Sequence, residues 1–246
     1  MTVTAPREGF EVEPPDVSGI VIDDGAPVDN PYSEKQMRLL TESLYASWGG
    51  PPGRDGEPEP RQFLAAANVG CFASPREPPL VPDVMLSLDV RWRSELWPDK
   101  RHMTYFVWEF GKPPDLVIEV VSNRVGGELD RKKRGYARMR VAYYVVWDPG
   151  GELGPAALHA FELRGDLYVP LKEPWFEAVG LGLTLWDGEY EGMADRWLRW
   201  CRTDGELIAT GAERADVESA RADAAATRVA ELEARLRALG VNPEDE

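Results

Sequence analysis

Residues 114–122, Pro-Asp-Leu-Val-Ile-Glu-Val-Val-Ser, set one carboxylate, Glu119, in the middle of an otherwise apolar run. A carboxylate in a buried strand must be paired, hydrogen-bonded, protonated or bound to a metal ion, because removing an ionised group from water is costly. Glu119 is therefore the first candidate functional residue. Pairing with a core arginine is the alternative to a metal site.

A second carboxylate enters an apolar run upstream, where Asp83 follows Pro82 and precedes Val84. Mg²⁺ needs only one or two carboxylates together with waters and substrate phosphates, so Asp83 and Glu119 would suffice for one ion. A nearby lysine would complete a hydrolytic site by holding the attacking water or the phosphate charge, and Lys132 is the best-placed candidate. The alternatives are that Asp83 only caps a local turn and that Lys132 is solvated.

The elements that must position these residues lie within residues 114–149, where the sequence predicts a strand, a helix and a second strand. Alternation along the first strand places Glu119 on one face. The opposite face carries Leu116, Ile118 and Val120. The second strand is expected at residues 143–147, and a crossover of this length predicts that the two strands run parallel.

The connecting helix is predicted from Glu128 to about residue 139. Its inner face is expected to carry Leu129, Tyr136 and Met139. The i, i+4 spacing places Lys132 on the same side of this helix as Tyr136.

Hydrophobic periodicity predicts further elements on both sides of this unit. A helix with Ser33 as its N-cap is expected over residues 32–48, and aromatic alternation predicts a strand over residues 103–110. Other strands are expected near residues 62–72, 82–90, 157–163, 166–171 and 175–186.

The formal net charge of −15 is unevenly distributed along the chain. Residues 1–30 carry seven acids against one arginine, and residues 204–246 carry eleven acids against five arginines. The middle of the chain is therefore close to neutral, and it contains a short basic stretch: Arg131, Lys132, Lys133, Arg134, Arg138 and Arg140. This stretch is either a nucleic-acid-binding face or an ordinary solvated helix face.

Composition excludes several classes of protein. The chain is 43% hydrophobic without an apolar run long enough for a membrane span, so a soluble cytoplasmic protein without a membrane partner is expected. Cys71 and Cys201 are far apart and lack a partner motif, which excludes a disulfide framework or a cysteine zinc site and predicts two reduced, buried thiols. His102 and His159 are isolated, which gives little support to a histidine-based site.

Composition also divides the chain into three parts. Residues 1–30 are expected to form a flexible, acidic tail rich in Pro and Gly, residues 31–203 a folded domain, and residues 204–246 an acidic helical tail. The last part has the 3, 4, 3 spacing of a coiled-coil seam, which predicts a homodimer, at Val229, Leu232, Leu236 and Leu239. A solitary, partly frayed helix is the alternative.

Several of these segments, taken together, resemble the Uma-type restriction endonuclease family of the PD-(D/E)XK nuclease superfamily. The resemblance covers roughly residues 31–203. It is found in Pro82-Asp83-Val84, in residues 113–122, in Lys132 four residues before Tyr136, and in residues 143–149, 180–183 and 186–192.

The resemblance implies an α/β (α+β) fold with a restriction-endonuclease-like core, in which helices flank a mixed β-sheet and a helical tail follows. It also implies that Asp83 and Glu119 bind Mg²⁺ or Mn²⁺, with the Val120 carbonyl as a third ligand. Water activated by the ion would then hydrolyse a phosphodiester bond in DNA.

The chain departs from the superfamily signature at one position. A lysine normally follows two residues after the second acid, and here that position is Val121. Lys132 matches the place to which the lysine has moved in the family, and Lys133 is the alternative. Among acids on the first helix, Glu34 or Glu42 could assist.

Two functions follow from these features. The first is a metal-dependent DNA endonuclease with Asp83, Glu119 and Lys132 as catalytic residues. The second is a non-catalytic nucleic-acid-binding or oligomerisation module that retains the nuclease fold, and it is motivated by Val121 and by the acidic net charge.

Overall fold

The computed structural model describes residues 15–22, 30–53, 59–92, 99–122 and 127–239. Its centre is a six-stranded sheet in the order β1-β3-β5-β6-β7-β8. The strands are β1 (Phe63–Ala67), β3 (Val84–Leu88), β5 (Leu116–Val120), β6 (Tyr143–Trp147), β7 (Leu158–Arg164) and β8 (Leu167–Pro170). Neighbours in this sheet are antiparallel except β5 and β6, which run parallel as predicted. The sheet is therefore mixed, in agreement with a restriction-endonuclease-like fold.

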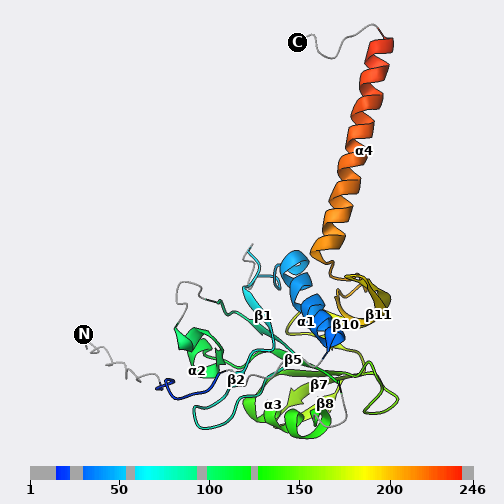
Figure 1. The fold of residues 1–246 in the computed structure, drawn as a ribbon. Helices are drawn as coiled ribbons and strands as arrows, with labels where there is room; N and C mark the ends of the chain where they lie inside the picture. The colour runs from blue at the N-terminus through cyan, green and yellow to red at the C-terminus, as the bar shows by residue number, and fades with distance from the viewer. Residues whose placement is uncertain (1–14, 23–29, 54–58, 93–98, 123–126, 240–246) are drawn as a thin grey trace, which may run out of the picture.

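One face of this sheet is covered by α1 (Pro31–Ser43), which continues into a π-helical turn at Leu44–Trp48, and by a second sheet (Figure 1). The second sheet has the order β11-β10-β9, with β9 (Trp175–Phe176), β10 (Leu181–Tyr190) and β11 (Met193–Cys201). The long β10–β11 hairpin extends beyond the strand predicted to end at residue 186.

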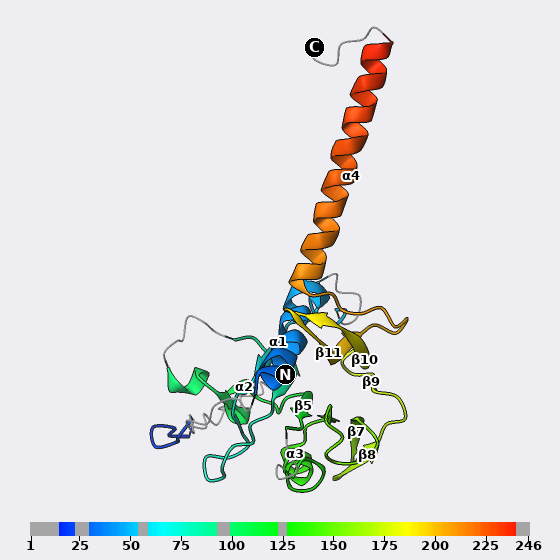
Figure 2. The same cartoon turned by 45° about the vertical axis from the view of Figure 1, so that its right-hand side comes forward.

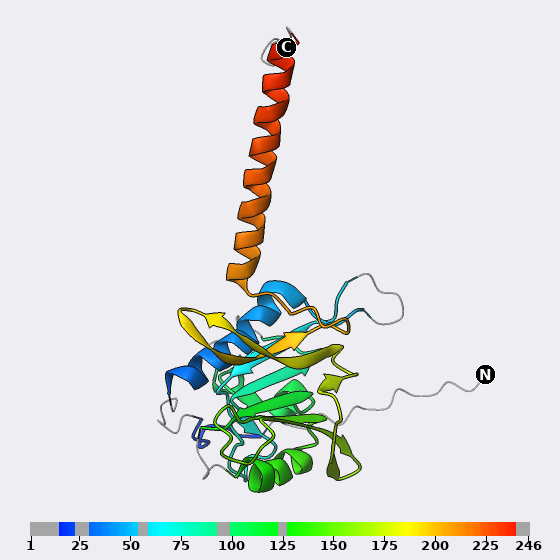
Figure 3. The same cartoon turned by 90° about the vertical axis from the view of Figure 1, so that its right-hand side faces the viewer.

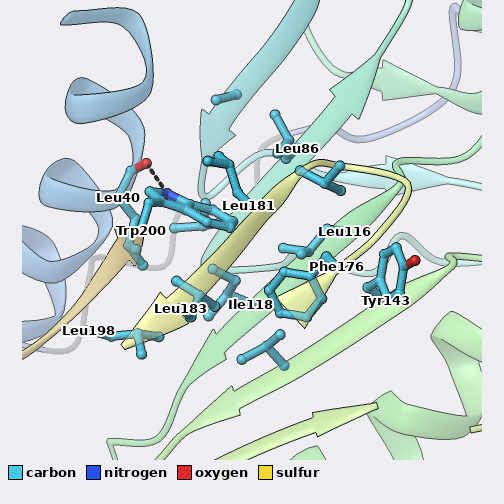
Figure 4. Packing of buried hydrophobic residues seen from close by; sticks show 14 of the residues in the cluster. Leu40, Leu86, Leu116, Ile118, Tyr143, Phe176, Leu181, Leu183, Leu198 and Trp200 are labelled. Atoms are coloured by element: carbon cyan, nitrogen blue, oxygen red, sulfur yellow. Dashed lines mark hydrogen bonds between the residues drawn. The ribbon is translucent and has the colours of Figure 1, made fainter. Parts of the chain in front are cut away.

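The larger hydrophobic core fills the space between these layers (Figure 4). Leu116 and Ile118 of β5 point into it, and the indole N–H of Trp200 on β11 donates to the Leu40 carbonyl of α1 at 2.8 Å. All four residues are buried, so α1, β11 and β5 are held in one packed unit.

The opposite face of the sheet is covered by α3 (Lys133–Met139), which follows a π-helical turn at Glu128–Lys132 (Figures 1 and 2). A second core cluster lies here and includes Val117, Tyr136, Tyr144 and Val146. The alternation predicted for β5 is thus confirmed, because Leu116, Ile118 and Val120 belong to one cluster and Val117 to the other.

Two sequence-based assignments are wrong. The N-cap of α1 is Asn30 rather than Ser33, because the Asn30 side chain accepts the Ser33 N–H at 2.9 Å and Pro31 begins the helix. The strand predicted over residues 103–110 is only β4 (Tyr105–Phe106), which pairs in parallel with β2 (Cys71–Phe72), and the chain then forms the short helix α2 (Val107–Phe110).

The aromatic alternation in that segment reflects ring packing instead of strand geometry. Phe110 stacks on Tyr105 with ring centroids 4.4 Å apart, and Trp108 stacks on Phe106 at 4.7 Å. Gly111 ends α2 at a φ of 75°, a left-handed conformation that glycine adopts readily.

Part of the segment expected to be a flexible tail packs against the domain. Within residues 15–22, Val17 is buried in a small cluster with Phe72 and Phe106. Residues 1–14 and 23–29 of that segment lie outside the described residues.

The C-terminal helix α4 (Gly211–Ala238) projects away from the sheets, and none of its side chains is buried (Figure 3). It starts at a capping box in which Thr210 and Glu213 bond each other's backbone N–H groups. Glu213 also pairs with Arg199 of β11, whose side chain is 2% exposed, at 2.6 Å. The base of α4 is thus fixed to the domain although its length is exposed. No described helix is both long and apolar enough to cross a membrane.

Candidate active site

Glu119 lies near the end of β5, and its carboxylate is fully buried on the face that α3 covers. Lys132 Nζ donates to Glu119 Oε2 at 2.7 Å, and the Tyr136 hydroxyl donates to Oε1 at 2.7 Å. Both carboxylate oxygens therefore have donors. The cation that pairs with Glu119 is a lysine from the following helical segment, so the alternative of a core arginine is wrong.

Asp83 precedes β3, which pairs antiparallel with β5 so that Val84 lies opposite Ile118. This register carries Asp83 past the end of that pairing, where its Oδ2 accepts the backbone N–H of Val120 at 2.6 Å. The acceptor and donor are 37 residues apart. Asp83 therefore joins two strands, which is more than the local turn cap considered from the sequence.

Burial raises the pKa of the Glu119 carboxyl to about 8. The positive charge of Lys132 acts in the opposite direction, and the negative charge of Asp83 adds to the increase. The pKa of the Tyr136 hydroxyl is raised well above its usual value, first by burial and then by the charge of Glu119. Tyr136 thus keeps its hydroxyl proton and donates it in the hydrogen bond to Glu119.

The two neighbouring lysines, Lys132 and Lys133, have different partners in the structure. Lys132 reaches Glu119, whereas Lys133 places its Nζ over the ring of Phe161, 3.4 Å from the centroid. Because Phe161 lies on β7, Lys133 contributes to packing and Lys132 to the carboxylate cluster.

The predicted inner face of the connecting helix is only partly correct. Tyr136 and Met139 are buried, but Leu129 is 36% exposed. Leu129 lies in the π-helical turn, whose wider hydrogen-bonding pattern changes the angular positions expected from 3.6 residues per turn.

The two acids on the first helix are engaged elsewhere. Glu34 pairs with Arg38, and Glu42 Oε1 accepts the backbone N–H of Gly211 at 2.7 Å. Their helix covers the sheet face opposite Glu119. These contacts give neither acid a role beside Asp83 and Glu119.

The donor chemistry of the cluster fits a divalent cation such as Mg²⁺. Two carboxylates from adjacent strands lie close enough for the charge of Asp83 to raise the pKa of Glu119, and a cation between them would offset that repulsion. Within the described parts of the chain, no group of three or more His, Cys, Asp or Glu side chains could hold a metal. A site built on Asp83 and Glu119 would therefore need water or substrate oxygens as further ligands.

A cleft of about 770 Å³ lies beside the cluster, between α3 and the loop of residues 73–81. Lys132 and Tyr136, the two residues that hold Glu119, both line this cleft. A ligand in this cleft would therefore contact the two residues that hold the buried carboxylate.

Tyr136 is a site residue that the sequence placed on the inner face of the helix, on the same side as Lys132, without a role in the site. Its spacing from Lys132 was the available signal, because residues four apart on a helix reach the same neighbour. The spacing did not reveal that the two side chains donate to different oxygens of the Glu119 carboxylate.

One family model, Uma2, described as a putative restriction endonuclease, matches residues 24–173. The match includes Asp83, Glu119 and Lys132 and ends before β9. No curated protein and no solved structure is significantly similar to the chain.

The raised pKa of Glu119 predicts a pH-dependent stability. Between about pH 4.5 and pH 8 the folded protein keeps a carboxyl proton that the unfolded chain has released, so the free energy of unfolding should fall as pH rises through this window. Urea denaturation in EDTA at several pH values measures this slope. Glu119→Gln should flatten it, whereas Glu231→Gln, on the exposed helix α4, should leave it unchanged. Equal slopes in the wild type and Glu119→Gln would contradict the assigned pKa.

Proposed function

This chain belongs to the Uma2 family of putative restriction endonucleases, and on that premise we propose that it is a metal-dependent endonuclease that hydrolyses phosphodiester bonds in DNA. The observation that carries the proposal is the contact between buried Glu119 and Lys132. It supplies a lysine to the second acid although the signature position holds Val121. We assign the nuclease domain to residues 31–203.

In the proposed mechanism, Asp83 and Glu119 would hold one Mg²⁺ or Mn²⁺. A divalent cation there would supply a Lewis acid for the phosphoryl oxygen and would lower the pKa of a bound water. Tyr136 fixes one oxygen of Glu119, and Asp83 is held by the Val120 N–H. Lys132 is 26% exposed at its side chain, so it can contact Glu119 and also meet a phosphate entering from the cleft.

A second candidate function is a nucleic-acid-binding module without catalysis. It is favoured by the occupation of both Glu119 oxygens by Lys132 and Tyr136 and by the apolar Val121 at the signature position. This function predicts DNA binding that weakens with salt and needs no metal ion, with no cleavage.

For the assembly we propose a homodimer through α4, in a parallel orientation. The seam residues are 39–78% exposed: Val229, Leu232, Leu236 and Leu239. Their spacing places Val229 and Leu236 at the heptad positions called a, and Leu232 and Leu239 at the positions called d. Two-stranded coiled coils favour a β-branched residue at a and leucine at d, the pattern found at Val229 and Leu232.

The charges beside this seam favour the parallel orientation. In the same heptad Arg228 occupies a g position and Glu233 the following e position, which face each other between chains only when the helices are parallel. An antiparallel pair would place the g positions, Arg228 and Arg235, beside one another. Within one chain Arg228 pairs with Glu231 on the exposed surface, a weak contact that the partner can replace.

The nuclease proposal predicts nicking of supercoiled plasmid with Mg²⁺ or Mn²⁺. Asp83→Asn, Glu119→Gln and Lys132→Met should each lower the cleavage rate by roughly 10²-fold or more, because each removes a proposed ligand or charge. Lys133→Met is the matched control and should remain active, since Lys133 contacts Phe161. A wild-type protein that binds DNA but never cleaves it would favour the second function.

The dimer proposal predicts a concentration-dependent association measured by sedimentation equilibrium. Leu232→Asp should give a monomer, whereas Ala234→Asp, on the outer face of the same helix, should not. Arg228→Glu should weaken the dimer by placing like charges together, and adding Glu233→Arg should restore it. A dimer strengthened by Arg228→Glu alone would show that the helices are antiparallel.

A further inference from the structure

The basic stretch around α3 contains cations of two kinds. Four of its six cationic side chains have partners in the fold: Lys132 with Glu119, Lys133 with the Phe161 ring, Arg134 with Asp130 and Arg140 with Asp166. Arg131 and Arg138 make no ion pair with any residue that the structure describes, and both are exposed. Their charges are therefore available to a ligand.

Arg131 and Arg138 both line the cleft of about 770 Å³ that also exposes Lys132 and Tyr136. The paired Arg134 and Arg140 do not line it. The unpaired guanidinium groups and the proposed catalytic lysine thus share one cavity, while the two arginines with exposed ion-pair partners lie outside it.

Gly135 brings α3 close to the opposite wall of the cleft. A Cβ at this position would lie 2.9 Å from Cδ1 of Leu80, so any larger residue would require the Leu80 side chain to shift. Arg131 precedes Gly135 in the sequence and Arg138 follows it, and all three residues line the cleft.

We propose that Arg131 and Arg138 bind phosphates of a DNA strand that lies along the cleft and presents a phosphodiester to Lys132. This inference rests on the proposed nuclease function and names the residues by which that site holds its substrate. Guanidinium groups suit the role because they stay charged and bind phosphate oxygens through two parallel hydrogen bonds.

One residue of the cleft has the opposite charge. Glu77 is exposed on the loop wall and lines the same cavity. It should repel a phosphate strand there, so its removal is expected to change DNA affinity in the direction opposite to removal of the arginines.

Fluorescence anisotropy with a labelled DNA duplex in EDTA measures binding without cleavage. Arg131→Ala and Arg138→Ala should each weaken binding, and each should reduce the slope of log affinity against log salt by about one phosphate contact. Glu77→Gln should tighten binding. Arg134→Ala and Arg140→Ala are matched controls, because they remove the same side chain from the same segment outside the cleft, and they should bind as the wild type does.

Circular dichroism on every variant distinguishes a folding defect from a binding defect. Because the substituted side chains are exposed, we expect no folding defect. Equal losses in the two control arginines would overturn the proposal, since binding would then depend only on overall charge. DNA cleavage that proceeds with undiminished affinity in the Arg131→Ala, Arg138→Ala double variant would also overturn it, although the nuclease function would stand. Arginine-dependent binding without cleavage would support this site and contradict the nuclease function.

Discussion

The burial of one carboxylate is the constraint on which the rest of the site depends. Glu119 has no contact with solvent, so its charge must be compensated by the protein or its proton retained. Lys132 and Tyr136 donate to its two oxygens, and the nearby charge of Asp83 opposes ionisation. The outcome is a carboxyl group whose pKa is raised by burial to about 8, with the positive charge of Lys132 opposing the increase.

The alternating faces of β5 let one short strand serve both the core and the site. Ile118 points into the apolar layer beneath α1 and the β10–β11 hairpin, while Glu119 points to the face of α3. The strand is held by its neighbours through hydrogen bonds on both edges and through the larger core on one face. The polar cluster can therefore be placed on the other face without supplying the stability of the sheet.

The net charge of −15 describes the surface around the cleft poorly. In the basic stretch at α3, Arg134 and Arg140 form ion pairs. Arg131 and Arg138 line one cavity beside Glu119. Much of the negative charge comes instead from residues 1–30 and 204–246, which carry seven acids against one arginine and eleven acids against five arginines. Local placement, not the total, decides where a phosphate can bind.

Local periodicity in the sequence determined the strand–helix–strand unit, the face of Glu119 and the spacing of Lys132 from Tyr136, because these depend on neighbours in the chain. Only the tertiary structure decided that Lys132 rather than Lys133 meets Glu119, because a π-helical turn and the position of Phe161 lie beyond any short repeat. Antiparallel pairing of β3 with β5 placed Asp83 at Val120, a contact between distant segments. Ring stacking likewise made a helix of residues 107–110, where alternation alone had predicted a strand.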